Sequence, residues 1–352
     1  MNSEIKHKPI EIFCGTGGVG KTTLATSRAL FLASKNLKVL LITIDPAKRL
    51  KQILSLNDDD SGRISTINSS IFKNFQDKNL SFDALLMSPH ATLQRMAKDN
   101  NQVEDFTNPI LKILARPNSG MNEIMAIVEV QHHLQMNNYD TVILDTPPGK
   151  HFIDFLESTH KIQSFFDKSF VEIFKFIGKQ VDKKTSFMPK KIINNIVSTG
   201  IKKLLSYLEK VTGKDFVNTF IEAIAVLYTN KDSFLEALTF QENLKSQDFS
   251  NWFLVASVEQ QKITEASTLH SDAKDFMHSD NYLAINKCLQ KDLLAWETEK
   301  DTKFDKLRST MLEREQNLCK YAKENFSKVV EFPEVFDAFP ENHVDILATY
   351  WS

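Results

Sequence analysis

The chain has 352 residues, of which 42% are hydrophobic and 25% are charged, and its formal net charge at pH 7 is −2. This composition excludes a wholly disordered chain, a collagen-like repeat and a small disulfide-stapled domain. The near-neutral charge provides no positive surface for nucleic acid, so no nucleic-acid partner is expected. No apolar run reaches the roughly 18 residues of a membrane span. These features predict a cytoplasmic protein and leave peripheral membrane contact open.

Short apolar runs typical of buried parallel strands recur along the chain, and each is followed by a helical pattern or a helix-starting turn. The runs are Ile10–Cys14, Lys38–Thr43, Asp140–Leu144, Trp252–Ser257, Tyr282–Ile285 and Lys328–Phe332. Alternating strands and helices predict an α/β protein with a doubly wound, mostly parallel sheet. In such sheets, ligands bind outside the carboxyl ends of the strands.

Two stretches depart from this alternation. Helical spacing of apolar residues, as in Phe166, Phe170 and Ile173, dominates about 81–137 and 157–251. A charged stretch at about 287–327 also has a helical pattern before the last strand. We therefore predict a single domain over 1–352 with two helical insertions and a helical segment near its end.

A phosphate-binding loop follows the first strand and leads into a helix. The segment matches G-x-x-x-x-G-K-[ST], in which backbone N–H groups and a helix N-terminus surround phosphate oxygens. We predict that Lys21 contacts the β and γ phosphates and that the Thr22 hydroxyl binds Mg²⁺. The predicted nucleotide-binding residues of this loop are Gly15, Thr16, Gly17, Gly18, Val19, Gly20, Lys21, Thr22 and Thr23.

Two aspartates end other predicted strands. Asp45 follows the second strand, and Asp145 follows the third, in the manner of a Walker-B aspartate. One carboxylate can orient the attacking water, and another can hold the hydration shell of Mg²⁺. Capping of a helix N-terminus is the structural alternative for either aspartate.

Several segments together resemble the ArsA and guided-entry branch of the deviant Walker-A NTPases. Asp45–Leu50 resembles the switch I of this family, and 145–151 (DTPPGKH) resembles its switch II. Residues 284–287 (AINK) are similar to the turn whose asparagine reads adenine, and Phe332-Pro333 matches the turn after the last strand.

This resemblance implies a P-loop NTPase fold of the SIMIBI type, ATP as the nucleotide and a dimer that encloses it. Transferred by position, it implies that Asp45 orients the hydrolytic water and that Asp145 lies in the outer shell of Mg²⁺. It also implies adenine contacts from Asn286 and a nucleotide-binding role for Pro333.

One position departs from the family pattern. The family loop has a lysine that reaches the phosphates of the partner subunit, whereas this chain has Thr16. A threonine cannot neutralise transition-state charge, and a cation supplied in trans can be worth about 10³ to 10⁵ in rate. We therefore expect slow hydrolysis unless Lys48, Arg49 or a lysine from a paralogous partner substitutes. Homodimers and heterodimers both remain open.

The cysteines form the second departure. ArsA-type pumps capture arsenite with clustered thiols, and targeting ATPases hold zinc with a CxxC pair. Cys14, Cys288 and Cys319 are too widely spaced in the sequence for a CxxC pair. No zinc or iron–sulfur cluster is expected, and Cys14 is interpreted as a small buried hydrophobe.

We interpret the chain as an ATP-driven switch that handles a hydrophobic protein client or a membrane partner. The predicted helical insertions are rich in phenylalanine, which suits an apolar client groove or, alternatively, a subdomain core. Three other readings stay open: an oxyanion efflux ATPase, a ParA/MinD-like positioning ATPase and a weakly hydrolysing regulatory subunit.

Overall fold

The structure is a computed structural model, which describes residues 5–44, 48–57, 60–99, 109, 122–158, 207, 209–300 and 302–351. The chain divides into two compact units. The first comprises 1–87, 130–156 and 241–352, and the second comprises 88–129 and 157–240. Within the described ranges, no helix combines the length and apolarity needed to cross a bilayer.

An eight-stranded sheet forms the centre of the first unit, in the order β3-β4-β2-β5-β1-β6-β7-β8. All neighbouring strands are parallel except β3 and β4, which pair antiparallel. The doubly wound α/β prediction is therefore confirmed. The strands are β1 (Ile10–Gly15), β2 (Val39–Thr43), β3 (Ile64–Asn68), β4 (Ser81–Leu86), β5 (Thr141–Asp145), β6 (Ser250–Ser257), β7 (Tyr282–Cys288) and β8 (Lys328–Pro333).

Strands β3 and β4 are additions to the six predicted strands. Residues 81–86, where the first helical insertion was expected to begin, form β4 instead. Strand β3 lies at the sheet edge with only Ile67 buried, so it lacks the continuous apolar run that marks a buried strand. Strand β3 is recognised by its antiparallel hydrogen bonding to β4 and not by a pattern of hydrophobic residues.

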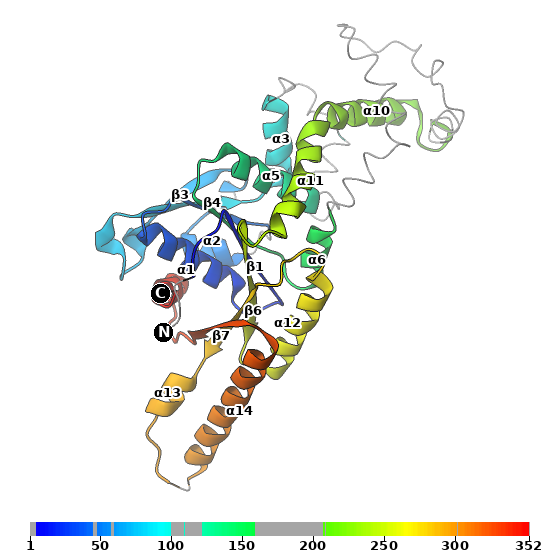
Figure 1. Cartoon of the computed structure of the whole chain (residues 1–352). Coiled ribbons are helices and arrows are strands. Elements are labelled where there is room, and N and C mark those ends of the chain that lie inside the picture. Colours follow the sequence, from blue (N-terminus) through cyan, green and yellow to red (C-terminus); the bar gives the residue numbers. More distant parts are fainter. Residues whose placement is uncertain are drawn as a thin grey trace. The chain divides into compact units, whose positions relative to one another are not determined.

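Helices cover both faces of the sheet (Figure 1). Helix α1 (Lys21–Ser34) packs with α15 (Pro340–Ala348) and α2 (Lys48–Leu54) on one face, while α12 (Gln260–Ala273) packs on β6. Short helix α6 (Lys150–Leu156) follows β5. Helices α13 (Gln290–Ala295) and α14 (Lys303–Asn325) connect β7 to β8 along the chain and pack against each other. Two 3-10 turns, Ser69–Ile71 and Gln76–Lys78, separate β3 from β4.

The described part of the second unit is helical. It includes α3 (Pro89–Asp99) and α10 (Lys214–Thr229). The boundaries between the two units fall within α5 (Asn122–Met136) and α11 (Lys231–Leu244), so each of these helices contributes residues to both units. Arg95 of α3 is bound to Glu129 of α5, with Nη2 2.9 Å from Oε2. This ion pair joins two helices within the second unit.

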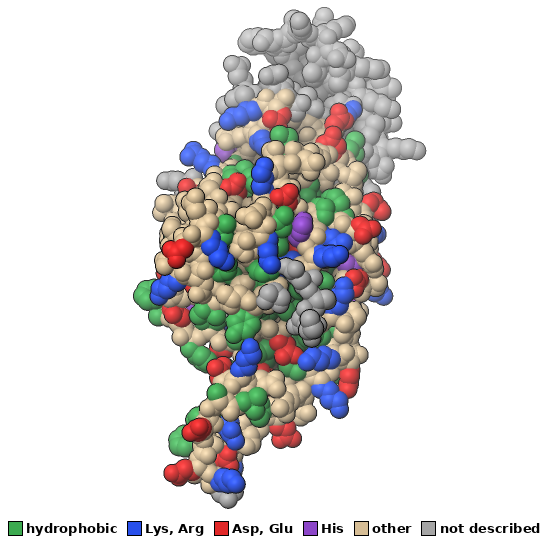
Figure 2. Space-filling view, turned by 60° about the vertical axis from the view of Figure 1, so that its left-hand side comes forward, with side chains coloured by type: hydrophobic (Ala, Val, Ile, Leu, Met, Phe, Trp, Pro, Cys, Tyr) green, Lys and Arg blue, Asp and Glu red, His purple; other side chains and the backbone are tan. Residues whose placement is uncertain are grey.

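The surface carries mixed charges. On the described part of the face drawn in Figure 2, Lys and Arg side chains alternate with Asp and Glu side chains. This face therefore presents no continuous positive field of the kind that a nucleic-acid backbone requires.

Aromatic side chains fill the space between the sheet and the α1 and α15 layer. The Phe13 and Phe253 rings stack at 4.7 Å, and Trp351 packs on Phe332 at 4.5 Å. Trp351 is 1% exposed. The end of the described chain is therefore part of the core that supports β1.

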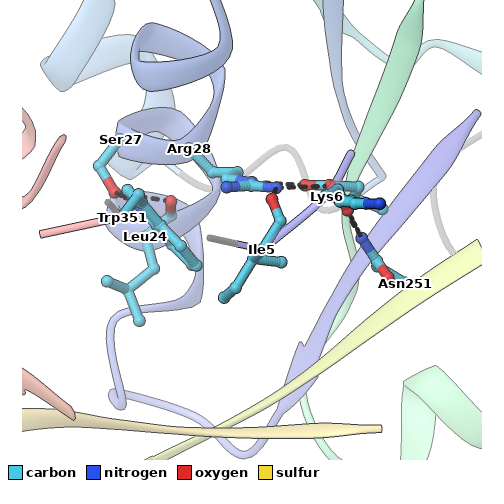
Figure 3. Close-up of polar contacts among 8 residues, drawn as sticks. Ile5, Lys6, Leu24, Ser27, Arg28, Asn251 and Trp351 are labelled. Carbon is cyan, nitrogen blue, oxygen red and sulfur yellow. Dashed lines mark hydrogen bonds and ion pairs between the residues drawn. The ribbon is translucent and has the colours of Figure 1, made fainter. Parts of the chain in front are cut away.

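A buried ion pair fixes α1 to the sheet. Arg28 of α1 and Glu11 of β1 are both fully buried, and the guanidinium binds the carboxylate through Nε at 2.8 Å and Nη2 at 2.9 Å. Nη2 also donates to the Ile5 carbonyl, and the guanidinium carbon lies 5.1 Å from the Trp351 ring (Figure 3). Asn251 donates a further hydrogen bond to Glu11. Helix α1, β1, β6 and Trp351 are thus all in contact with this ion pair.

We predict that Arg28→Met destabilises the protein by about 3 to 5 kcal/mol, because it leaves the Glu11 carboxylate buried without its cation. Urea unfolding followed by tryptophan fluorescence measures this change. The double variant Glu11→Met/Arg28→Met should recover much of the loss, because it removes both charges. Equal destabilisation of the single and double variants would contradict the ion-pair explanation.

Candidate functional site

The phosphate loop connects the end of β1 to the start of α1. Gly20 adopts a left-handed conformation with φ of 94° at the N-cap of α1, which favours glycine. Lys21, the first residue of the helix, donates from Nζ to the Thr16 carbonyl at 2.9 Å. The lysine ammonium therefore lies across the loop formed by the residues before it.

Neighbouring strands approach the backbone of this loop closely at both ends. A side chain at Gly15 would collide with the Val255 carbonyl of β6, and one at Gly20 would collide with the Asn286 amide. Gly149, in the turn after β5, donates its N–H to the Gly15 carbonyl at 3.1 Å. The ends of three strands thus hold the loop backbone in one conformation.

Asp145 lies at the carboxyl end of β5 and accepts two hydroxyl hydrogen bonds. The Thr22 hydroxyl donates to Oδ2 at 2.8 Å, and the Thr43 hydroxyl of β2 donates to the same oxygen at 3.1 Å. Asp145 is 2% exposed. The structure brings the two predicted metal residues, Thr22 and Asp145, into direct contact. Because carboxylate and hydroxyl oxygens are ligands or outer-shell partners that Mg²⁺ accepts, this pair suits the metal of a nucleotide complex.

A cavity of about 460 Å³ opens beside the loop, a size typical of small-molecule sites. Predicted residues in its lining are Gly17, Gly18, Gly20, Lys21, Thr22, Thr23, Asp145, Asn286 and Pro333. Gly15, Thr16 and Val19 belong to the loop but do not line the cavity. Thus the structure gathers the loop, the Walker-B aspartate and two distant turns around one space.

Further residues in this lining were not predicted. They are Thr146, Pro148, Lys287, Glu334, Val335, His343 and Leu347. Thr146 and Pro148 belong to the segment recognised as switch II, which could have indicated them. Lys287 belongs to the 284–287 segment, which could have indicated it as well. The others come from the loop after β8 and from α15, where no local motif marks a binding residue.

Asn286 braces the phosphate loop. Its side-chain amide donates to the Val19 carbonyl at 2.9 Å and packs against Gly20. The next residue, Lys287, has φ of 65° where the pairing of β7 with β8 is interrupted. A positive φ is unusual for lysine and occurs more often at functional sites. The adenine contact predicted for Asn286 therefore comes with a second contact, to the loop itself.

Two predicted catalytic groups cannot be placed. Asp45 lies outside the described residues. Arg49 belongs to α2, but its side chain also lies outside the described part of the structure. The roles of Asp45 and Arg49 stay predictions.

The cysteines are free thiols. Cys14 is buried beneath the loop, and burial raises the pKa of its thiol to about 12. Burial also raises the pKa of Cys319 to about 11 and that of Cys288 further. Because the thiolate is the metal-binding form, these environments disfavour metal capture near pH 7. Among the described residues, no group of three or more His, Cys, Asp or Glu is arranged to hold a metal ion.

Comparison with known proteins supports the motif assignment. ATPase get3 of Schizosaccharomyces japonicus is 33% identical over 145 residues, which are 40% of this chain and 41% of that protein. ATPase GET3 of Malassezia globosa is 32% identical over 146 residues, 41% of each chain. The alignments thus span about two fifths of the length of these relatives. A family model described as anion-transporting ATPase matches residues 9–333. The chain belongs to the anion-transporting ATPase family.

Proposed function

We propose that this protein binds ATP with Mg²⁺ and hydrolyses it as a nucleotide-dependent switch. The proposal rests on the hydrogen bond between Thr22 and Asp145. Both residues line the cavity beside the phosphate loop, and Lys21 lines it too. Membership of an ATPase family and the similarity to proteins named ATPase get3 point to the same activity.

Each described group has a place in this activity. The loop N–H groups and Lys21 would bind phosphate oxygens, and Thr22 and Asp145 would hold Mg²⁺ and its water shell. When bound, Mg²⁺ neutralises charge that develops on the phosphates. Asp45 is proposed to orient the attacking water. Asn286 and Pro333 line the cavity where the base would lie.

The cation that stabilises the transition state is proposed to come from Lys48, Arg49 or a second subunit, because Thr16 carries no charge. We therefore propose a dimer, either of two copies or with a paralogue that has the loop lysine. Sedimentation with and without ATP measures the number of subunits.

We further propose that the nucleotide state controls binding of a hydrophobic protein client. In the second unit, apolar side chains are exposed at Tyr207, Val211, Phe216 and Leu235. The Phe216 ring stacks on Phe220 of the same helix, α10, at 6.4 Å. Exposed apolar side chains of this kind suit an apolar helical ligand, which binds by its own amphipathic stripe. The resemblance of residues 145–151 to the switch II of the guided-entry branch supports this choice.

Lys21→Met should weaken ATP binding by about tenfold to a hundredfold, because a charged donor to the phosphates is lost. Titration with a fluorescent ATP analogue measures the affinity. Lys245→Met removes an exposed lysine of the same unit and should leave the affinity unchanged. Equal affinities of the wild type and Lys21→Met would overturn the assignment of the loop.

Asp145→Asn should raise the Mg²⁺ concentration needed for half-maximal ATPase activity, because the buried carboxylate near Thr22 loses its charge. A Mg²⁺ titration of the hydrolysis rate measures this change. Asp140→Asn at the other end of β5 is the matched control, since Asp140 is exposed and accepts only from the Lys38 backbone among the contacts described. Thermal unfolding of both variants accounts for any loss of folded protein. An unchanged Mg²⁺ requirement in Asp145→Asn would contradict the metal role.

Client binding predicts nucleotide-dependent cross-linking to a helical peptide of about 20 apolar residues. Phe216→Glu should reduce the cross-linked fraction severalfold, because it introduces a charge on the exposed face of α10. Phe336→Glu is the control, since Phe336 is 77% exposed but belongs to the first unit. The same yield for both variants, or no dependence on ATP, would count against this proposal.

A further inference from the structure

The turn at the end of β7 brings two residues to the cavity and has an unusual backbone. Asn286 and Lys287 both line the cavity, and Asn286 also binds the Val19 carbonyl of the phosphate loop. Lys287 has φ of 65°, and the pairing of β7 with β8 is irregular from Ile285 to Cys288. A lysine in the left-handed region persists only where the surrounding structure holds it. Contacts on both sides of Lys287 must therefore fix this turn.

Glu315 of α14 supplies the contact on the side that follows Lys287. The Leu289 N–H donates to both of its carboxylate oxygens at 3.0 Å, and the Gln290 N–H donates to Oε1 at 2.9 Å. Glu315 is 4% exposed, so little water competes for these bonds. Hydrogen bonds from N–H groups to a carboxylate are shorter and stronger than those between neutral groups. Glu315 therefore fixes the backbone immediately after the turn.

The residue between Lys287 and Leu289 is also attached to the cavity wall. The Cys288 carbonyl accepts from the Glu334 N–H at 2.9 Å, and Cys288 pairs with Pro333 in the sheet. Pro333 and Glu334 both line the cavity. Because Leu289 lies at most about 7 Å along the chain from Lys287, a shift at Leu289 would displace residues of the cavity wall.

Helix α14 holds the Glu315 carboxylate in place. Glu315, Leu318 and Ala322 lie on one face of this helix, and all three are buried. The helix packs on α12 and β8 as well as on α13, which lies beside it in Figure 1. The carboxylate thus comes from the buried face of a packed helix, and it can leave the turn only if that packing changes.

Asn286 has an orientation that favours one kind of base. Its side-chain nitrogen donates to a carbonyl, which fixes which way the amide is turned. Its side-chain oxygen accepts hydrogen bonds, which suits the amino group of adenine and not the carbonyl at the same ring position of guanine. Discrimination between the two bases therefore requires that this turn keep its position.

We propose that Glu315 is a positioning residue for base recognition in the nucleotide site. By holding the start of α13, it keeps Asn286 and Lys287 in the conformation that contacts the base. This inference rests on the proposed binding of ATP, and it assigns the discrimination between adenine and guanine to the turn after β7. The phosphate contacts of Lys21 lie on a different segment and do not depend on Glu315.

The selectivity between two nucleotides tests this proposal, because a loss of folded protein alone would weaken the binding of both. Glu315→Gln keeps the size of the side chain but replaces one acceptor oxygen with a donor, which opposes the N–H groups at the start of α13. The variant should bind a fluorescent ATP analogue about threefold to tenfold more weakly, which is the value of one hydrogen bond. Its affinity for the matching GTP analogue should change by less than about twofold, because the phosphate contacts are intact. The ratio of the ATP affinity to the GTP affinity should therefore fall.

Glu313→Gln is the matched control, since Glu313 is exposed on the same helix. It should bind both analogues as the wild type does. Thermal unfolding without nucleotide measures the stability of both variants. Glu315→Asp retains the charge on a shorter side chain, and it takes the place of Glu315→Gln in the titrations if the latter does not fold. The affinity ratio should fall in Glu315→Asp as well, by a smaller factor.

Three results would overturn the inference in distinguishable ways. An unchanged affinity ratio in the folded Glu315 variants, even where both affinities fall, would leave the proposed ATP site in place and remove Glu315 from base recognition. Equal affinities of the wild type for the two analogues would show that the site does not distinguish the bases. No binding of either analogue by the wild type would overturn the proposed function and this inference together.

Discussion

The close fit of the phosphate loop against its neighbours is the constraint on which the site depends. At its first residue the loop touches the backbone of β6, and at its last glycine it touches the Asn286 side chain of β7. Neither position has room for a side chain. Because these contacts come from strands far apart in the sequence, the loop has its conformation only when that half of the sheet is assembled.

The Arg28–Glu11 pair imposes a second constraint, on the helix that follows the loop. Helix α1 presents Lys21 and Thr22 to the cavity from its first turn and buries Arg28 two turns later. Because the guanidinium is bound to β1 and packs on Trp351, the helix can neither slide nor rotate without exposing a buried charge to apolar surroundings. The ion pair of Arg28 therefore also fixes the position of Lys21 and Thr22 at the start of α1.

The core strands and the loop could be predicted because their signals are local. Strands β1, β2, β5, β6, β7 and β8 are apolar runs with turns at their ends, and the loop has a spacing that its chemistry requires. Strand β3 was missed because it is an edge strand with a single buried residue. Strand β4 is largely buried and pairs parallel with β2, but Ser81 and Asp83 interrupt its apolar run. Glu334 and His343 were missed because each reaches the cavity from a segment without a motif of its own.

The sequence by itself determined the chemistry of the site: a phosphate loop with Lys21 and Thr22, an aspartate after a buried strand, and a threonine where the family has a lysine. These are properties of neighbouring residues. Only the tertiary structure decided how they are used. It joined Thr22 to Asp145 and placed the Asn286 side chain against Gly20. The reason is physical, because a side chain's direction and partners depend on strands that meet only when the sheet forms.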